Sequence, residues 1–201
     1  LMAFLIGVVL AFQGAAQLRQ FGAEVFVVDL IAISLLRELG IILTAIIVAG
    51  RSGSAFTAAI GSMKMRQEID AMSTLGLDPV EVLVVPRVLA LLVMLPVLGF
   101  IDIFVWLVCR ALISWIELGV SPGMFRARML DSVHVSNLIV GMVKAPFFAI
   151  IIALIGCYEG LKVEGDSESL GQRTSKSVVL AIFFVIVTDA VFSIFFALMN
   201  L

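Results

Sequence analysis

Residues 88–109 read VLALLVMLPVLGFIDIFVWLVC, an apolar run interrupted only by Pro96 and Asp102. A helix of roughly 20 mostly apolar residues is long enough to cross the hydrocarbon core of a bilayer. The rest of the chain has the same character, because 62% of its 201 residues are hydrophobic and only 14% are charged. A soluble domain of this length needs more charge on its surface. The sequence therefore predicts an all-α polytopic membrane protein.

Four further stretches have a similar length and apolar content, so we expect five transmembrane helices. The first covers residues 1–18, the second 25–49 with Arg37 and Glu38, the fourth 138–157 with Lys144, and the fifth 178–199 with Asp189. Polar connections are expected at 51–87, 110–137 and 158–177, and the last, rich in Gly, Ser and charge, is typical of a surface loop.

The distribution of Lys and Arg predicts the orientation. Seven of these residues fall on one side of the predicted topology (Arg51, Lys64, Arg66, Arg87, Lys162, Arg173 and Lys176) and four on the other (Arg19, Arg110, Arg126 and Arg128). Cytoplasmic loops carry the excess of positive charge. The side that holds the 51–87 connection is therefore expected to face the cytoplasm.

Several classes of function find no support in the residues. The net charge of −2 offers no basic face for nucleic acid. Cys109 and Cys157 are expected at opposite membrane faces and hence as free thiols, and the single histidine, His134, is a poor metal site. No catalytic arrangement and no phosphate-binding loop are visible, so any ATP chemistry must come from another chain. The sequence thus predicts neither catalytic nor metal-ligating residues.

The connection 51–87 is the most informative segment. It opens with closely spaced small residues, among them Gly53, Ala58 and Gly61, whose spacing of three and four residues allows helices to approach closely. A short amphipathic helix is then expected at about 63–76, ended by Gly76 and by Asp78-Pro79. Met65, Ile69, Met72 and Leu75 share its apolar face, and Lys64, Arg66, Glu68 and Asp70 its polar faces. Such a helix is either a plain connector or a docking helix for a partner protein.

Charged groups inside the predicted spans need partners or a wet cavity, because each costs roughly 2.5–3.5 kcal/mol at a helix centre on insertion scales. Lys144 and Asp189 are predicted to form a structural ion pair between the fourth and fifth spans. Asp102 has no obvious partner. Arg37 and Glu38 are adjacent and point about 100° apart on a helix, so they either form separate interhelical ion pairs or face a polar pocket.

Several motifs resemble the MlaE/YrbE family of permeases, the membrane subunits of ABC transporters that work with MCE proteins. They are Ser34-Leu35-Leu36-Arg37-Glu38-Leu39-Gly40, Ala49-Gly50-Arg51-Ser52-Gly53-Ser54-Ala55, Glu68-Ile69-Asp70-Ala71-Met72 with Leu75-Gly76 and Asp78-Pro79, and Val85-Pro86-Arg87. The resemblance runs from about Leu10 to the C-terminus. It implies a single permease domain over 1–201 in a bacterial inner membrane, with the family's N-terminal interfacial segment missing.

The resemblance also implies partners and cargo. These are a second permease copy, a cytoplasmic ABC ATPase dimer that uses ATP and Mg, a periplasmic MCE ring and phospholipid; a small STAS-type subunit is a further candidate. The chain itself would need no cofactor. The helix at 63–76 then becomes the coupling helix, with Lys64, Arg66, Glu68, Asp70, Met72, Gly76, Asp78 and Pro79 as its coupling residues.

A lipid site follows from the same resemblance. Arg37 and Glu38 would lie by the lipid cavity, where the guanidinium fork suits a phosphate. Leu10, Gln13, Gln17 and Phe21 line up with first-helix positions near the lipid and share one helix face, although Gln17 is more polar than the family pattern. Packing of the helix bundle is the competing interpretation for each of these four.

The sequence is also compatible with two other functions. A secondary transporter would use the intramembrane charges as an ion path, but it predicts an internal repeat that is not visible. A structural scaffold for an envelope complex would leave a docking helix without a purpose unless an ATPase binds. The carboxylates Glu159, Glu164, Asp166 and Glu168 are expected to form a solvated acidic face, with a supporting ATPase contact as the alternative.

Overall fold

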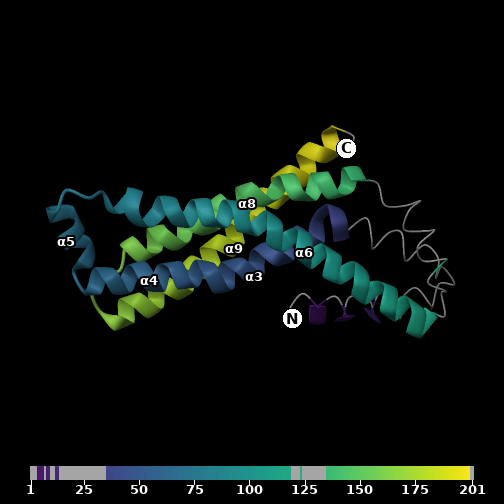
Figure 1. The fold of residues 1–201 in the computed structure, drawn as a ribbon, viewed down its shortest axis with the longest axis horizontal. Coiled ribbons are helices and arrows are strands. Elements are labelled where there is room, and N and C mark those ends of the chain that lie inside the picture. Colours follow the sequence, from purple (N-terminus) through teal and green to yellow (C-terminus); the bar gives the residue numbers. More distant parts are fainter. Residues whose placement is uncertain are drawn as a thin grey trace. The chain divides into compact units, whose positions relative to one another are not determined.

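The computed structural model describes residues 4–6, 8–9, 12–13, 35–118, 123 and 135–199, and every regular element within these ranges is helical (Figure 1). The chain divides into two compact units, which are described separately. Unit 1 comprises residues 1–44, 98–143 and 201, and unit 2 comprises 45–97 and 144–200.

The helices follow one another with few interruptions. From Leu35 to Met65 the chain runs through η1 (Leu35–Leu39), α3 (Gly40–Val48), η2 (Ala49–Gly53) and α4 (Ser54–Met65), where η marks π-helix. After the short helix α5 (Glu68–Thr74) come η3 (Val80–Val84), α6 (Val85–Leu118), α8 (Val135–Leu161) and α9 (Ser167–Leu198).

Four helical stretches in the described residues are long and apolar enough to cross a membrane: Arg37–Met65, Val80–Cys109, Asn137–Leu161 and Ser167–Leu198. They correspond to the second to fifth predicted spans. The first predicted span, 1–18, lies mostly outside the described residues. The chain is therefore a multi-pass helical membrane protein.

Several predicted boundaries are wrong, because helices extend into all three predicted polar connections. Besides the two cases below, η3 already begins at Val80 and α6 runs on to Leu118. The second span does not end at Ala49, because the helix continues to Met65. The Ser54 hydroxyl donates to the Gly50 carbonyl, and the Thr57 hydroxyl lies 3.1 Å from the Gly53 carbonyl oxygen, so both polar residues have partners within their own helix. The predicted surface loop at 158–177 shrinks to 162–166, since α8 runs to Leu161 and Asp166 caps α9 by accepting from the Ser169 N–H.

Unit 2 is built around a close approach of helices. A Cβ added to Gly156 of α8 would lie 2.9 Å from the carbonyl oxygen of Gly53, and one added to Gly160 would lie 2.9 Å from Ile60 Cβ. A Cβ added to Gly61 would lie 2.7 Å from the Val163 side chain, in the loop between α8 and α9, and 2.5 Å from the Leu170 side chain of α9. The predicted use of small residues for packing is thus confirmed at Gly53 and Gly61, whereas a Cβ on Gly50 would meet nothing within 4 Å.

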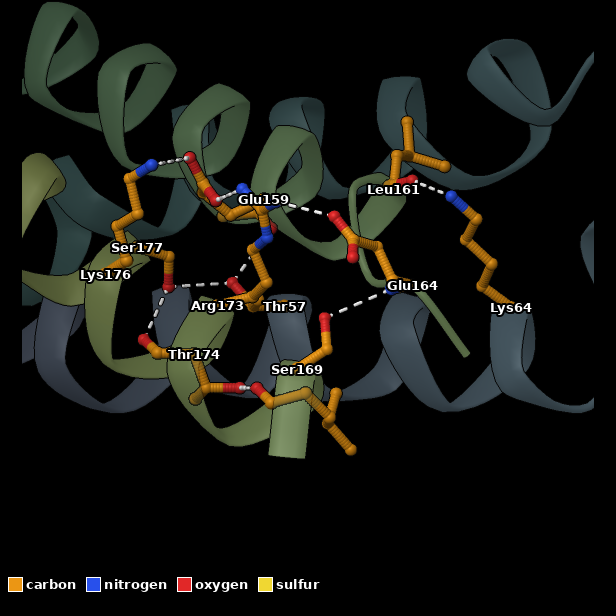
Figure 2. Close-up of polar contacts among 12 residues, drawn as sticks. Thr57, Lys64, Glu159, Leu161, Glu164, Ser169, Arg173, Thr174, Lys176 and Ser177 are labelled. Atoms are coloured by element: carbon orange, nitrogen blue, oxygen red, sulfur yellow. Dashed lines mark hydrogen bonds and ion pairs between the residues drawn. The ribbon is translucent and has the colours of Figure 1, made fainter. Parts of the chain in front are cut away.

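The close approach brings polar groups together as well. The Thr57 hydroxyl, which is fully buried, lies 2.9 Å from the Gly156 carbonyl oxygen and 2.8 Å from Ser177 Oγ of α9. The Ser177 hydroxyl donates to the Thr174 carbonyl, so its oxygen can accept from Thr57. α9 accordingly packs along η2 and α4 (Figures 1 and 2). Three spans therefore meet at Thr57.

Unit 1 contains a smaller set of equivalent contacts. Asp102 of α6, which the sequence left without a partner, accepts a 2.8 Å hydrogen bond from the hydroxyl of Thr44 in α3. Gly99 lies against Ile41, where an added Cβ would come within 2.5 Å of Cδ1. One turn further along α6, Trp106 is buried with Ile6 and Leu43 packed against it. Asp102 is thus hydrogen-bonded to α3, which belongs to the preceding span.

The glycine contact at Gly156 can be tested by adding one methyl group. Gly156→Ala should lower stability by about 1–3 kcal/mol, because the new Cβ meets backbone that cannot move aside without separating the helices. Thermal unfolding of the purified protein in detergent measures the change. Gly171→Ala is the control, since this α9 glycine faces open space and should gain up to about 1 kcal/mol. Equal melting temperatures for the two variants would contradict the packing.

Candidate functional site

Arg37 and Glu38 lie in η1, at the start of the described part of their span, and both are half-buried. π-Helical turns inside longer helices are frequent at functional sites. Of the first-helix residues that the resemblance assigns to the lipid, Gln13 is helical and exposed. Leu10, Gln17 and Phe21 lie outside the described residues, as does His134. Of the six residues of the predicted lipid site, the structure therefore describes Arg37, Glu38 and Gln13.

Lys144 and Asp189 do meet across α8 and α9. Lys144 Nζ lies 2.9 Å from Asp189 Oδ1, with the two side chains 1% and 11% exposed. Ser193, one turn further along α9, lies 3.5 Å from the same ammonium. The predicted pairing of these two charges is therefore present in the structure, deep in unit 2.

The predicted helix at 63–76 is not continuous. Met63 to Met65 are the last residues of α4, and a turn at Arg66–Gln67 separates them from α5. Gln67 adopts the left-handed conformation, with φ of 60°, which is uncommon for a residue other than glycine. Nothing in the run Met65-Arg66-Gln67-Glu68 disfavours a helix, so the break must come from tertiary packing.

Packing of α5 against the rest of unit 2 explains the break in the helix. Ile69 is buried with Ile60, Leu83, Val84 and Cys157, and Met72 packs against this cluster. Leu75, predicted to share the apolar face, is instead 77% exposed. A helix of seven residues is too short to be stable alone, so contacts of Ile69 and Met72 hold it in place.

The predicted end of the helix is confirmed. Gly76 has a φ of +78°, its N–H donates to the Ser73 carbonyl, and the Leu77 N–H donates to the Met72 carbonyl. These two bonds form a Schellman motif, in which glycine supplies the left-handed residue. The side chain of Asp78 then accepts from the Val80 N–H and so begins η3. Gly76 and Asp78 therefore shape the backbone at the end of α5 and the start of η3.

The polar residues around α5 have different surroundings. Arg66 and Glu68 form an exposed ion pair of 3.8 Å, and Asp70 is exposed. Lys64, in contrast, contacts another helix of the protein. Its ammonium donates to the carbonyl oxygen of Leu161, the last residue of α8, at 2.5 Å (Figure 2). The ends of α4 and α8 therefore lie on the same side of the membrane, and Lys64 is engaged inside the protein.

The acidic residues of the α8–α9 hairpin do not form a uniformly solvated face, so that expectation is wrong for Glu159. Glu159 is 2% exposed and pairs with Arg173 at 3.2 Å and with Lys176 at 3.9 Å. Arg173 also reaches the exposed Glu164 at 3.4 Å (Figure 2). The reason is geometric, because the neighbouring Gly160 brings this turn of α8 against α4, and Arg173 and Lys176 reach Glu159 from α9.

Sequence reasoning missed Glu159-Arg173 and Thr57-Ser177. A usable signal existed for both, since Gly156 and Gly160 form a small-xxx-small pattern that marks close helix contact. Within the described ranges no group of three His, Cys, Asp or Glu could hold a metal ion. Cys109 and Cys157 are both free thiols, as predicted, and both are buried.

The described helices define a multi-pass helical membrane protein with the short helix α5 between two candidate spans, and comparison with known proteins identifies its family. The family model described as Permease MlaE matches residues 1–195. The chain is 38% identical over 179 residues to the intermembrane phospholipid transport system permease protein MlaE of Haemophilus influenzae, covering 88% of this chain and 68% of that one. This chain belongs to the MlaE permease family.

Further relatives extend the comparison beyond one bacterial group. A probable ABC transporter permease of Synechocystis is 34% identical, with 92% of this chain and 70% of that protein covered. The chloroplast protein TRIGALACTOSYLDIACYLGLYCEROL 1 of Arabidopsis thaliana is 31% identical, with 95% of this chain and 55% of that protein covered. The similarity thus spans nearly all of the described helices.

The Lys144-Asp189 pair can be tested with a double-mutant cycle. Lys144→Met or Asp189→Leu alone should destabilise the protein by roughly 3–5 kcal/mol, because the remaining buried charge loses its counter-charge. The double variant should lose less than the sum of the two, and thermal unfolding in detergent measures all three. Strictly additive losses would show that the two side chains do not stabilise each other.

Proposed function

We propose that this chain is the membrane-spanning permease subunit of an ABC transporter that moves phospholipid between the inner membrane and the cell envelope. The observation that carries the proposal is α5, a short helix fixed between two spans with its outer surface available to a partner. Membership of the MlaE family supplies the class of transporter, and the names of the relatives supply ABC transport and phospholipid.

The surface of α5 suits a cytoplasmic ATPase. Leu75 is 77% and Leu77 48% exposed, although neither lies in a candidate membrane span. Exposed apolar side chains outside the lipid, flanked by charged groups, are typical of a protein contact. Asp70 and the Arg66-Glu68 pair supply those charges. We infer that Leu75 and Leu77 enter a cleft of the ATPase, with α5 as the coupling helix.

The lipid site is proposed at η1, where Arg37 and Glu38 are half-buried at the start of their described span. The Arg37 guanidinium would bind the phosphate of a headgroup, and Glu38 would fix the orientation of the site or bind a cationic headgroup. Gln13, with Leu10, Gln17 and Phe21, would complete the cavity wall from the first helix.

The proposal includes further partners. A second copy of the permease would complete the pathway, two ATPase subunits would use ATP and Mg, and an MCE ring would receive or deliver lipid on the periplasmic side; a small STAS-type subunit remains a candidate. The bacterial inner membrane is the proposed location, with α5 and the α8–α9 loop on the cytoplasmic side, where the excess of Lys and Arg lies.

The coupling role of α5 predicts that Leu75→Ala weakens binding of the ATPase roughly tenfold, which corresponds to about 1.4 kcal/mol of lost apolar contact. Co-purification at increasing dilution, or a binding titration with the purified ATPase, measures the effect. Leu198→Ala is the matched control, because Leu198 is similarly exposed at 79% but is the last residue of α9 and lies outside α5. Unchanged ATPase binding in Leu75→Ala would argue against the docking role.

The lipid role predicts that Arg37→Ala and Glu38→Ala each lower phospholipid transport about tenfold or more, the scale of one charge-assisted hydrogen bond. Fluorescent phospholipid transfer in proteoliposomes containing the whole complex measures transport. Arg37→Lys should recover only part of the rate, because an ammonium lacks the fork that binds phosphate. Wild-type transport in both alanine variants, at normal expression, would contradict the site.

A further inference from the structure

The C-terminal turn of α8 is held from two sides by side chains of other helices (Figure 2). From α4, Lys64 donates to the Leu161 carbonyl at 2.5 Å. From α9, Arg173 pairs with Glu159 at 3.2 Å. Lys64, Glu159, Leu161 and Arg173 are called the end clamp here. It joins the ends of three spans directly beside the turn that leads into α5.

Burying the charged groups of the end clamp costs solvation free energy, and this cost indicates a role beyond folding. Glu159 is 2% exposed, and a buried carboxylate loses several kcal/mol of solvation that an ion pair only partly returns. A carbonyl at the end of a helix that reaches the membrane surface can be satisfied by water. α8 therefore needs neither contact in order to form, and an apolar residue at 159 would pack at least as well.

Lys64 connects the clamp to α5. Its side chain holds α8, while its backbone carbonyl accepts the hydrogen bond of the Gln67 N–H, which closes the turn before α5. Gln67 is the left-handed residue of this turn. A change in the direction of α5 must therefore change the position of the Lys64 peptide, and with it the contact to Leu161.

A second route runs through apolar packing. Ile69 of α5 and Cys157 of α8 belong to the same buried cluster, and Leu161 packs against it. Glu159 lies on α8 between Cys157 and Leu161, and Arg173 fastens this turn to α9. Force applied to α5 thus reaches α8 through two contacts, and the Glu159-Arg173 pair passes it on to α9.

From this arrangement we propose that the end clamp is a positioning element of transport: it transmits the movement of α5 to α8 and α9, so that ATP hydrolysis and lipid movement stay coupled. The proposal rests on the function proposed above. Lys64, Glu159 and Arg173 are positioning residues, since they act through other helices. Weakening the clamp should leave ATP hydrolysis in place and lower the lipid moved for each ATP consumed.

The test uses the whole complex in proteoliposomes and measures ATP hydrolysis and fluorescent phospholipid transfer on the same preparation. Lys64→Met and Arg173→Gln remove one side of the clamp each, and Glu159→Asp keeps the charge but lengthens the contact. In all three, we expect the lipid moved per ATP to fall at least threefold. In Arg173→Gln and Glu159→Asp, which change no residue of the coupling helix, ATPase binding and hydrolysis should also stay within twofold of wild type. Lys64→Arg, which can still donate to Leu161, should restore the ratio.

The controls remove polar groups from the same end of the protein. Lys162→Met and Gln172→Ala change exposed neighbours of clamp residues and should keep the wild-type ratio. An unchanged ratio in the clamp variants, or transport and hydrolysis falling in proportion, would overturn the inference. If Lys64→Met and Arg173→Gln fail to assemble, Glu159→Asp decides by the same ratio. A wild-type complex without ATP-dependent lipid transfer would contradict the proposed function itself.

Discussion

The contact between Gly53 and Gly156 is the constraint on which unit 2 depends. Helices in lipid gain little from burying apolar surface against each other, because lipid tails are equally apolar, so their association relies on close packing and on hydrogen bonds between helices. A single methyl group on Gly156 would lie 2.9 Å from the Gly53 carbonyl oxygen. Only without it can Thr57 come within 2.9 Å of the Gly156 carbonyl and 2.8 Å of Ser177. The glycines thus make the polar contacts possible, and the polar contacts then fix the register of the three helices.

Charged groups inside the spans also pair with groups on other helices. Lys144 meets Asp189, Glu159 meets Arg173, and Asp102 accepts from Thr44, each across two helices. An ion pair in a low-dielectric interior adds little net stability, yet it makes any other register expensive, because displacement separates buried charges. We infer that these contacts contribute more to the uniqueness of the helix arrangement than to its free energy of unfolding.

Composition and apolar run length were sufficient to predict the fold class, four of the spans and the Lys144-Asp189 contact. Boundaries were predicted less well, because Ser54 and Thr57 look like loop residues but bond to their own helix. The break at Gln67 could not be predicted, since the run Met65 to Glu68 favours a helix and only the burial of Ile69 bends it. The burial of Glu159 depends on Gly160, four residues after Gly156, a pattern that the sequence does display.

The short length of α5 makes its direction a property of unit 2 rather than of its own sequence. Seven residues form too few internal hydrogen bonds for independent stability, so Ile69 and Met72 must hold the helix on one side, with the Schellman motif at Gly76 closing its end. Those contacts leave Leu75 outward at 77% exposure. A helix held in this way cannot move by itself. A partner that binds Leu75 and shifts α5 must also shift the cluster of Ile60, Leu83 and Cys157. These three residues belong to three different spans. The residues that allow α5 to fold are therefore the same residues that would carry its movement into the membrane.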